Sequence, residues 1–209
     1  MGATIKWFNH ASFRISAGPA VVYIDPWKIT DSPKDGTVVL ISHSHYDHLS
    51  PEDIARVLAP NGAVFGPADV TARVSKCRTI TPGETVQIGT SRVAGVAAYN
   101  IDKKFHPRVS NWLGYVVELA GTRIYYAGDT DLTAEMGQLG RINVALLPVG
   151  GTYTMDAQTA ANAVARINPD LAVPYHWGDI VGQRDDAERF VALIAPKGKV
   201  LEPGQSVTV

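Results

Sequence analysis

The chain has 209 residues, of which 45% are hydrophobic and 19% charged, with a formal net charge of −1. Such a length is typical of one domain with a core of its own, so we expect a single domain over residues 1–209. The lone cysteine, Cys77, excludes a disulfide framework and a cysteine-rich zinc site. The near-zero charge argues against a polynucleotide partner, and no apolar run reaches the roughly 18 residues of a membrane span. Because residues 1–10 also lack the pattern of a signal peptide, we expect a cytoplasmic protein without membrane contact.

Short runs of β-branched and aromatic residues, separated by turn residues, predict strands along most of the chain. The expected strands cover residues 5–8, 13–15, 21–24, 38–42, 63–65, 86–88, 92–98, 114–119, 123–127, 144–148 and 171–174, and residues 200–209 are expected to end a sheet. Helices are expected from Ser50 onward, over 67–76, and, from apolar spacing, over 157–167 and 187–194. This order, with strand-rich blocks each followed by helices, favours two packed sheets with helices outside over a regular βαβ alternation.

The most informative motif is the segment His43-Ser44-His45-Tyr46-Asp47-His48, which directly follows the buried strand expected at 38–42. Three imidazoles and a carboxylate within six residues are typical metal ligands. In an extended segment His43 and His45 point the same way, so both can bind one ion. Asp47 and His48 lie where the chain turns toward a helix, and there they can face a second ion.

Two further candidate ligands also follow buried strands. Asp129 comes after the strand at 123–127, and His176 comes after the strand at 171–174. Taken alone, Asp129 could cap a helix near Thr133 and His176 could be an ordinary core histidine. Together they supply the ligands that the first motif lacks, since a carboxylate can bridge two metals, and we therefore predict both as metal ligands.

With these residues in place, the sequence resembles the metallo-β-lactamase-fold hydrolases over nearly its whole length. The resemblance rests on His43-x-His45-x-Asp47-His48, on Asp129 and His176, and on the segments Trp7–Phe13, Ile24–Trp27, Leu147–Gly151 and Thr154–Asp156. The opening segments are similar to the small single-domain branch that includes proteins like ascorbate-6-phosphate lactonases. The resemblance implies an α/β fold, a four-layer αββα sandwich with its metals at one edge of the paired sheets, and Asp129 as the bridging aspartate.

One position departs from the family pattern. The superfamily usually supplies another histidine to the first metal site, and the corresponding segment here ends on Asn100. An amide oxygen is a weaker zinc ligand than an imidazole. Either Asn100 completes a weakened first site, or His106 reaches it from the same loop. With Asn100 as ligand, we predict that the second site holds its metal more tightly.

The loop that contains His106 also carries positive charge. It contains Lys103, Lys104 and Arg108 but only one acidic residue, Asp102, in a chain whose net charge is otherwise near zero. This cluster predicts a small anionic substrate, with Lys104 and Arg108 in contact with it. His10, in the turn between the first two strands, is a further candidate for the pocket wall.

These residues favour a metal-dependent hydrolase in which a metal-activated hydroxide attacks a phosphoester, phosphodiester or lactone. The cofactor is expected to be one or two Zn²⁺ ions, with Mn²⁺ or Fe²⁺ as alternatives. Asp47 and His106 are the candidate catalytic residues, His106 as a proton donor to the leaving group. The alternatives are a nucleotide phosphodiesterase or nuclease, a di-iron redox protein, and a non-catalytic metal-binding protein; a homo-oligomer stays open.

Overall fold

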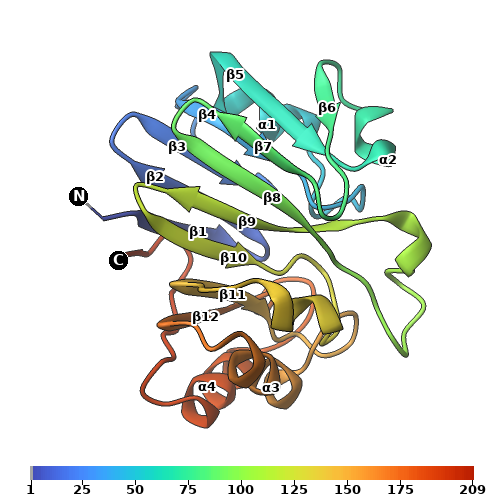
Figure 1. Ribbon diagram of the computed structural model, residues 1–209, viewed down its shortest axis with the longest axis vertical. Coiled ribbons are helices and arrows are strands. Elements are labelled where there is room, and N and C mark those ends of the chain that lie inside the picture. Colours follow the sequence, from blue (N-terminus) through green and yellow to red (C-terminus); the bar gives the residue numbers. More distant parts are fainter. Residues whose placement is uncertain (1) are drawn as a thin grey trace.

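The computed structural model describes residues 2–209 and consists of two sheets packed face to face (Figure 1). The first sheet has the strand order β13 (Ser206–Thr208), β1 (Thr4–Asn9), β2 (Ser12–Ala17), β3 (Ala20–Ile24), β4 (Gly36–Leu40), β5 (Leu58–Gly66) and β6 (Cys77–Thr79). The second has the order β12 (Leu171–Tyr175), β11 (Val144–Pro148), β10 (Thr122–Tyr126), β9 (Leu113–Leu119), β8 (Ser91–Ala97) and β7 (Thr85–Ile88). The two-sheet prediction is confirmed.

Helices cover the outer faces, which completes four αββα layers. On the first sheet lie α1 (Pro51–Val57) and α2 (Ala68–Thr71), and on the second lie α3 (Ala157–Ile167) and α4 (Arg184–Leu193) (Figure 1). Strand β4 shows how its sheet is buried on both sides. Val38 and Leu40 belong to the core between the sheets, whereas Val39 packs in the separate core beneath α1 and α2. The expected αββα architecture is therefore confirmed.

Several element boundaries differ from those expected. The helix expected over 67–76 is the single turn α2, and the chain then forms β6, which the sequence analysis did not predict. Strand β6 was missed because Cys77-Arg78-Thr79 has no apolar alternation. Of residues 200–209 only β13 forms a strand, and it pairs with β1. Helix α1 begins as expected, with the Ser50 hydroxyl accepting a hydrogen bond from the Asp53 amide at 3.2 Å.

The strand directions bring distant segments to one edge of the sandwich. Strands β3, β4 and β5 run parallel, as do β10, β11 and β12, so within each set the carboxyl ends lie together. The segment after β4 begins with the histidine motif, the segment after β10 carries Asp129, and the segment after β12 carries His176. In the part of the chain that is described, no helix combines the length and apolar character needed to cross a membrane.

Candidate metal centre

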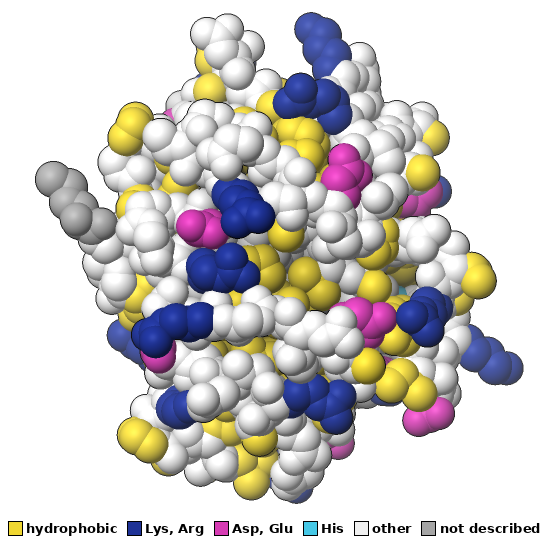
Figure 2. Space-filling model, in the orientation of Figure 1, with side chains coloured by type: hydrophobic (Ala, Val, Ile, Leu, Met, Phe, Trp, Pro, Cys, Tyr) yellow, Lys and Arg dark blue, Asp and Glu magenta, His cyan; other side chains and the backbone are white. Residues whose placement is uncertain are grey.

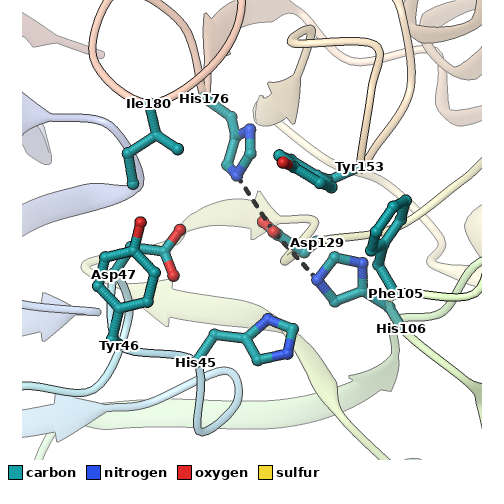
Figure 3. A pocket seen from close by; sticks show the side chains of 9 residues that line it. All are labelled: His45, Tyr46, Asp47, Phe105, His106, Asp129, Tyr153, His176 and Ile180. Atoms are coloured by element: carbon teal, nitrogen blue, oxygen red, sulfur yellow. Dashed lines mark ion pairs between the residues drawn. The ribbon is translucent and has the colours of Figure 1, made fainter.

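All six histidines of the chain gather at this edge of the sandwich, together with Asp47 and Asp129. They arrive on five segments that are far apart in sequence. One segment is the β1–β2 turn, three follow β4, β10 and β12, and the fifth is the loop between β8 and β9. Figure 3 shows five of these side chains, His45, Asp47, His106, Asp129 and His176, turned toward a common space.

The first subsite is formed by His43, His45 and His106. Each offers a ring nitrogen, and the three nitrogens lie within 4.8 Å of one another. His43 Nε2 is 3.0 Å from His45 Nδ1, and His106 Nε2 is 3.3 Å from Asp129 Oδ2. Three imidazoles with a carboxylate beside them make a suitable site for zinc.

The second subsite is formed by Asp47, His48 and His176, and a ring nitrogen of His10 lies beside them, with all four ligand atoms within 4.8 Å of one another. Asp129 lies between the two subsites. Its Oδ2 is 3.1 Å from His176 Nε2, and its Oδ1 is 3.4 Å from His48 Nε2. The aspartate is thus placed to serve both subsites.

The donor atoms themselves indicate that this cluster fits divalent ions. Nε2 of His48, of His106 and of His176, together with Oδ1 of Asp129, are buried and have no hydrogen-bond partner among residues 2–209. Buried polar atoms are normally paired, because each unpaired one costs free energy. Several unpaired atoms around one space are explained if they coordinate metal, and the nitrogen and carboxylate set suits zinc, manganese or iron.

Protonation at the cluster favours ligation at most positions. Burial holds the pKa of His43 well below its ordinary value and lowers that of His45, so both rings are neutral at pH 7. Burial would raise the pKa of Asp129, but the neighbouring His176 and His48 hold it well below the usual range, so it is a carboxylate. For His48 the effect of burial is overcome by the charges of Asp129 and Asp25, which raise its pKa well above the ordinary value.

A family model described as a beta-lactamase superfamily domain matches residues 4–176. The chain belongs to this superfamily. A UPF0173 metal-dependent hydrolase from Aeropyrum pernix is 31% identical, with 98% of this chain and 96% of that protein aligned. Another from Thermoplasma acidophilum is 33% identical, with 93% and 92% aligned. The structure is similar to that of Igni18, a metallo hydrolase from Ignicoccus hospitalis, with a TM-score of 0.82, 26% identity and 100% and 99% of the two chains covered.

The sequence left open whether Asn100 or His106 is the further ligand of the first metal site. The Asn100 Oδ1 accepts a hydrogen bond from the His106 backbone amide at 3.0 Å and lies 3.2 Å from His106 Nδ1. A proton on Nδ1 that points to Asn100 leaves Nε2 free to coordinate, as is usual for histidine ligands. We therefore propose His106 as the ligand of the first subsite and Asn100 as the residue that orients it. With His106 as the ligand, the first subsite has three imidazoles, and the tighter binding expected at the second site stays a prediction.

Asp25 supports the second subsite, a role that the sequence alone does not predict. This fully buried carboxylate is 2.8 Å from His48 Nδ1 and accepts hydrogen bonds from the Ser42 hydroxyl at 2.5 Å and the Tyr126 hydroxyl at 2.7 Å. It fixes the ring of His48 with Nε2 toward Asp129. In the sequence, the only signal for Asp25 is its place in the segment Ile24–Trp27, which resembles the family.

Two other buried tyrosines form hydrogen bonds with the backbone next to the metal-ligand candidates. Tyr175 donates its hydroxyl to the carbonyl oxygen of Gly128 at 2.6 Å, and Tyr115 donates to the carbonyl of Ile41 at 2.6 Å. Gly128 precedes Asp129, and Ile41 lies two residues before His43. The backbone on which these ligands sit is therefore held by side chains that extend from the core between the sheets.

His10 lies beneath the surface and does not line the cavity as a substrate contact. Its Nε2 is 3.1 Å from Asp47 Oδ2, and its ring centroid is 4.1 Å from that of His176. Burial lowers the pKa of His10. Burial would raise the pKa of Asp47, but the hydrogen bond with His10 and the charge of His48 hold it below the ordinary value. His10 thus fixes Asp47 from behind.

The basic residues of the loop do not face the centre. The Arg108 guanidinium is 3.3 Å from Glu135 Oε1 and packs over the ring of Tyr99, where it lines a different cavity. Lys103 is paired with Asp131, and Lys104 is exposed and does not line the cavity at the metal centre. The expectation that Lys104 and Arg108 contact substrate is corrected, because Glu135 and Tyr99 hold Arg108 in another direction.

A cavity of about 220 Å³ opens over the cluster. Its floor is made of metal-ligand candidates, and its remaining wall is made of four side chains that the sequence analysis did not assign to the site. These are Tyr46, Phe105, Tyr153 and Ile180 (Figure 3). They lie on four different loops, so no local pattern in the sequence brings them together.

Proposed function

We propose that this protein is a metal-dependent hydrolase of a small molecule and that it uses water activated at the His/Asp centre. One observation carries the proposal: unpaired buried ligand atoms converge on the floor of an open cavity. An isolated structural metal site would not need access to solvent. The curated relatives, which are named metal-dependent hydrolases, support the same reaction class.

The proposed ligands are His43, His45 and His106 for one ion and Asp47, His48 and His176 for the other, with Asp129 between them. A divalent ion held there would lower the pKa of a coordinated water from about 15.7 toward about 7, which makes hydroxide available near neutral pH. Zinc is our first proposal, with manganese and iron as alternatives that have the same ligand preferences.

The chain's own residues orient the reaction. Asp47 lines the cavity and stays ionised, so its carboxylate can accept a hydrogen bond from the attacking water while His10 holds its orientation. His106 has its Nε2 directed at Asp129, so we propose it as a ligand in place of the proton donor expected from the sequence. The leaving group then takes its proton from solvent at the open mouth.

The substrate alternatives can also be narrowed. The cavity is smaller than the roughly 300–1,000 Å³ of sites for drug-sized ligands, which disfavours a nucleotide or nucleic acid. No lysine or arginine of residues 2–209 lines it, so an anionic substrate would depend on the charge of the bound ions alone. Three imidazoles at the first subsite argue against a non-catalytic protein with one subsite impaired.

The test is to strip the protein with chelator, reload it with zinc, manganese or iron, and assay carboxylic esters, lactones and phosphodiesters. We expect hydrolysis that disappears on stripping and returns with at least one metal. The matched control is Asp35→Asn, which removes a carboxylate that pairs with Arg14 away from the centre. Turnover that persists in the stripped protein would contradict the proposal.

A further inference from the structure

The cavity over the metal centre has two chemically different halves. Its floor consists of His45, Asp47, His106, Asp129 and His176. Its remaining wall consists of Tyr46 and Ile180 on one side of these residues and of Phe105 and Tyr153 on the other (Figure 3). The reacting group of a substrate belongs at the floor. The wall therefore contacts the part of the substrate that does not react.

The apolar side chains of this wall are unusually exposed. Tyr46 is 70% exposed, Phe105 46% and Ile180 36%, and these three are among the few large hydrophobic side chains exposed in the described part of the chain. A single exposed apolar residue needs no explanation, but several around one opening mark a binding surface. They come from three separate loops, so their gathering is a property of the tertiary structure.

The part of the wall made by Phe105 and Tyr153 is also preformed. The rings of Phe105 and Tyr153 meet edge to face, with centroids 4.7 Å apart at 90°. The Asn100 Nδ2 donates to the Tyr153 carbonyl oxygen at 2.9 Å, while its Oδ1 accepts from His106. One amide thus fixes the aromatic wall relative to a ligand of the floor. A substrate would pay little free energy to order this surface.

Three cations near the opening pair with acidic side chains, and a fourth, Lys104, is exposed and does not line the cavity. Arg108 pairs with Glu135, Lys103 pairs with Asp131, and Lys28 lies 2.7 Å from Asp179 and packs over Trp27. An anionic group on the non-reacting part of a substrate would therefore lie among aromatic and aliphatic side chains, with no lysine or arginine of the described residues lining the cavity, at a desolvation cost.

We propose that the substrate is a small uncharged carboxylic ester or lactone whose aryl or branched alkyl group binds between Tyr46, Phe105, Tyr153 and Ile180. This inference rests on the proposed hydrolase function and adds the substrate class. Hydrolysis forms a bond from the carbonyl carbon to the water oxygen and breaks the acyl carbon–oxygen bond. One water proton goes to the leaving oxygen, and the acid product releases the other to solvent.

The kinetic test compares three esters on the zinc-loaded protein: methyl hydrocinnamate, which carries an aryl group, monomethyl succinate, which carries a charge, and methyl acetate, which is too short to reach the wall. We expect kcat/KM for methyl hydrocinnamate to exceed that for monomethyl succinate by about tenfold or more. Phe105→Ala and Ile180→Ala should each lower the ratio of kcat/KM for methyl hydrocinnamate to kcat/KM for methyl acetate by about tenfold. The matched control is Val109→Ala, which truncates a side chain that is 87% exposed in the same loop but outside the cavity.

A binding measurement separates the two proposals. Benzylacetone, a ketone without a scissile bond, should give saturation-transfer NMR signals from its ring protons with the wild-type protein and lose them with Ile180→Arg. Ketone binding without turnover of any ester would refute the hydrolase and support the apolar site. Turnover that prefers monomethyl succinate, or a preference unchanged in the wall variants, would overturn the inference.

Discussion

The two subsites offer similar ligands but are supported in different ways. His106 of the first subsite sits on the long loop between β8 and β9, and its ring is oriented by one amide, that of Asn100. His48 of the second subsite is oriented by Asp25, which is fully buried and also bonded to Ser42 and Tyr126. The same metal chemistry is thus supported by a loop on one side and by the core on the other. We therefore expect the metal affinity of each subsite to depend on the residues that support its ligands.

The largest loss of activity and of bound metal is expected for a substitution of Asp129, which lies between the two subsites. Asp129→Asn keeps the shape of the side chain but removes the charge shared by both subsites. We expect a loss of activity beyond the roughly 10–100-fold that removal of an outer support costs, and a metal content below that of the wild type. Mass spectrometry of bound metal and circular dichroism of the fold check this. Unchanged stoichiometry with full activity would end the proposal that Asp129 serves both ions.

Removing the core support should weaken only the second subsite. Asp25→Asn retains an acceptor but loses the charge that pairs with His48, so we expect about 10–100-fold weaker binding of one ion and little change in the other. Competition with a chromophoric chelator resolves the two affinities. Asp35→Asn is the control carboxylate, and an equal loss at both subsites would show that the two are not independent.

The two subsites should also differ in pH dependence. The raised pKa of His48 means that it holds a proton at neutral pH, and this proton must leave before a metal binds. Affinity at the second subsite should therefore rise by about tenfold per pH unit below that pKa. His43 and His45, whose pKa values are lowered, are already neutral, so affinity at the first subsite should change less between pH 7 and pH 8. Calorimetric titration across that range measures both slopes, and identical slopes would contradict the comparison.

A smaller loss of metal affinity is expected when Asn100, which orients His106 in the loop between β8 and β9, is replaced. Asn100→Ala removes the acceptor beside His106, and we expect about tenfold weaker metal binding at the first subsite. Asn100→Asp keeps the acceptor oxygens and should retain most of this affinity, although the bond to Tyr153 is lost. If the alanine variant binds both ions as the wild type does, Asn100 does not position His106.

The smallest effect is expected at Arg108, because its guanidinium pairs with Glu135 away from the cavity. Arg108→Ala should leave KM for charged and uncharged esters within about twofold of the wild type, as for a surface ion pair worth little energy. Steady-state kinetics on monomethyl succinate and methyl hydrocinnamate decide this. A rise in KM confined to the charged ester would restore Arg108 as a substrate contact.

The sequence predicted those parts of the centre that depend on local order. His43, His45, Asp47 and His48 are close in the chain, and Asp129 and His176 each follow a recognisable buried strand. The two-sheet arrangement followed from strand and helix order in the same way. The structure gathers these side chains at one edge, while their assignment as metal ligands remains a prediction for the experiments above.

The rest of the site depends on contacts that no local pattern encodes. Asp25 meets Tyr126 across 101 positions of sequence and His48 across 23. The direction of Arg108 is set by Glu135, which lies 27 positions further on. A run of basic residues therefore indicated a charged loop correctly but could not show where its side chains point.

The buried tyrosines have a consequence for engineering this protein. Tyr115, Tyr126 and Tyr175 fill the interior with aromatic area, yet each sends a hydroxyl into the scaffold of the centre. Replacing them with phenylalanine in a search for thermostability would keep most of the packing and would free a carbonyl or carboxylate from a bond it needs. Each such change would take a hydrogen bond from a buried acceptor, which costs free energy of folding, so the stability of the core and the placement of the ligands depend on the same three hydroxyls.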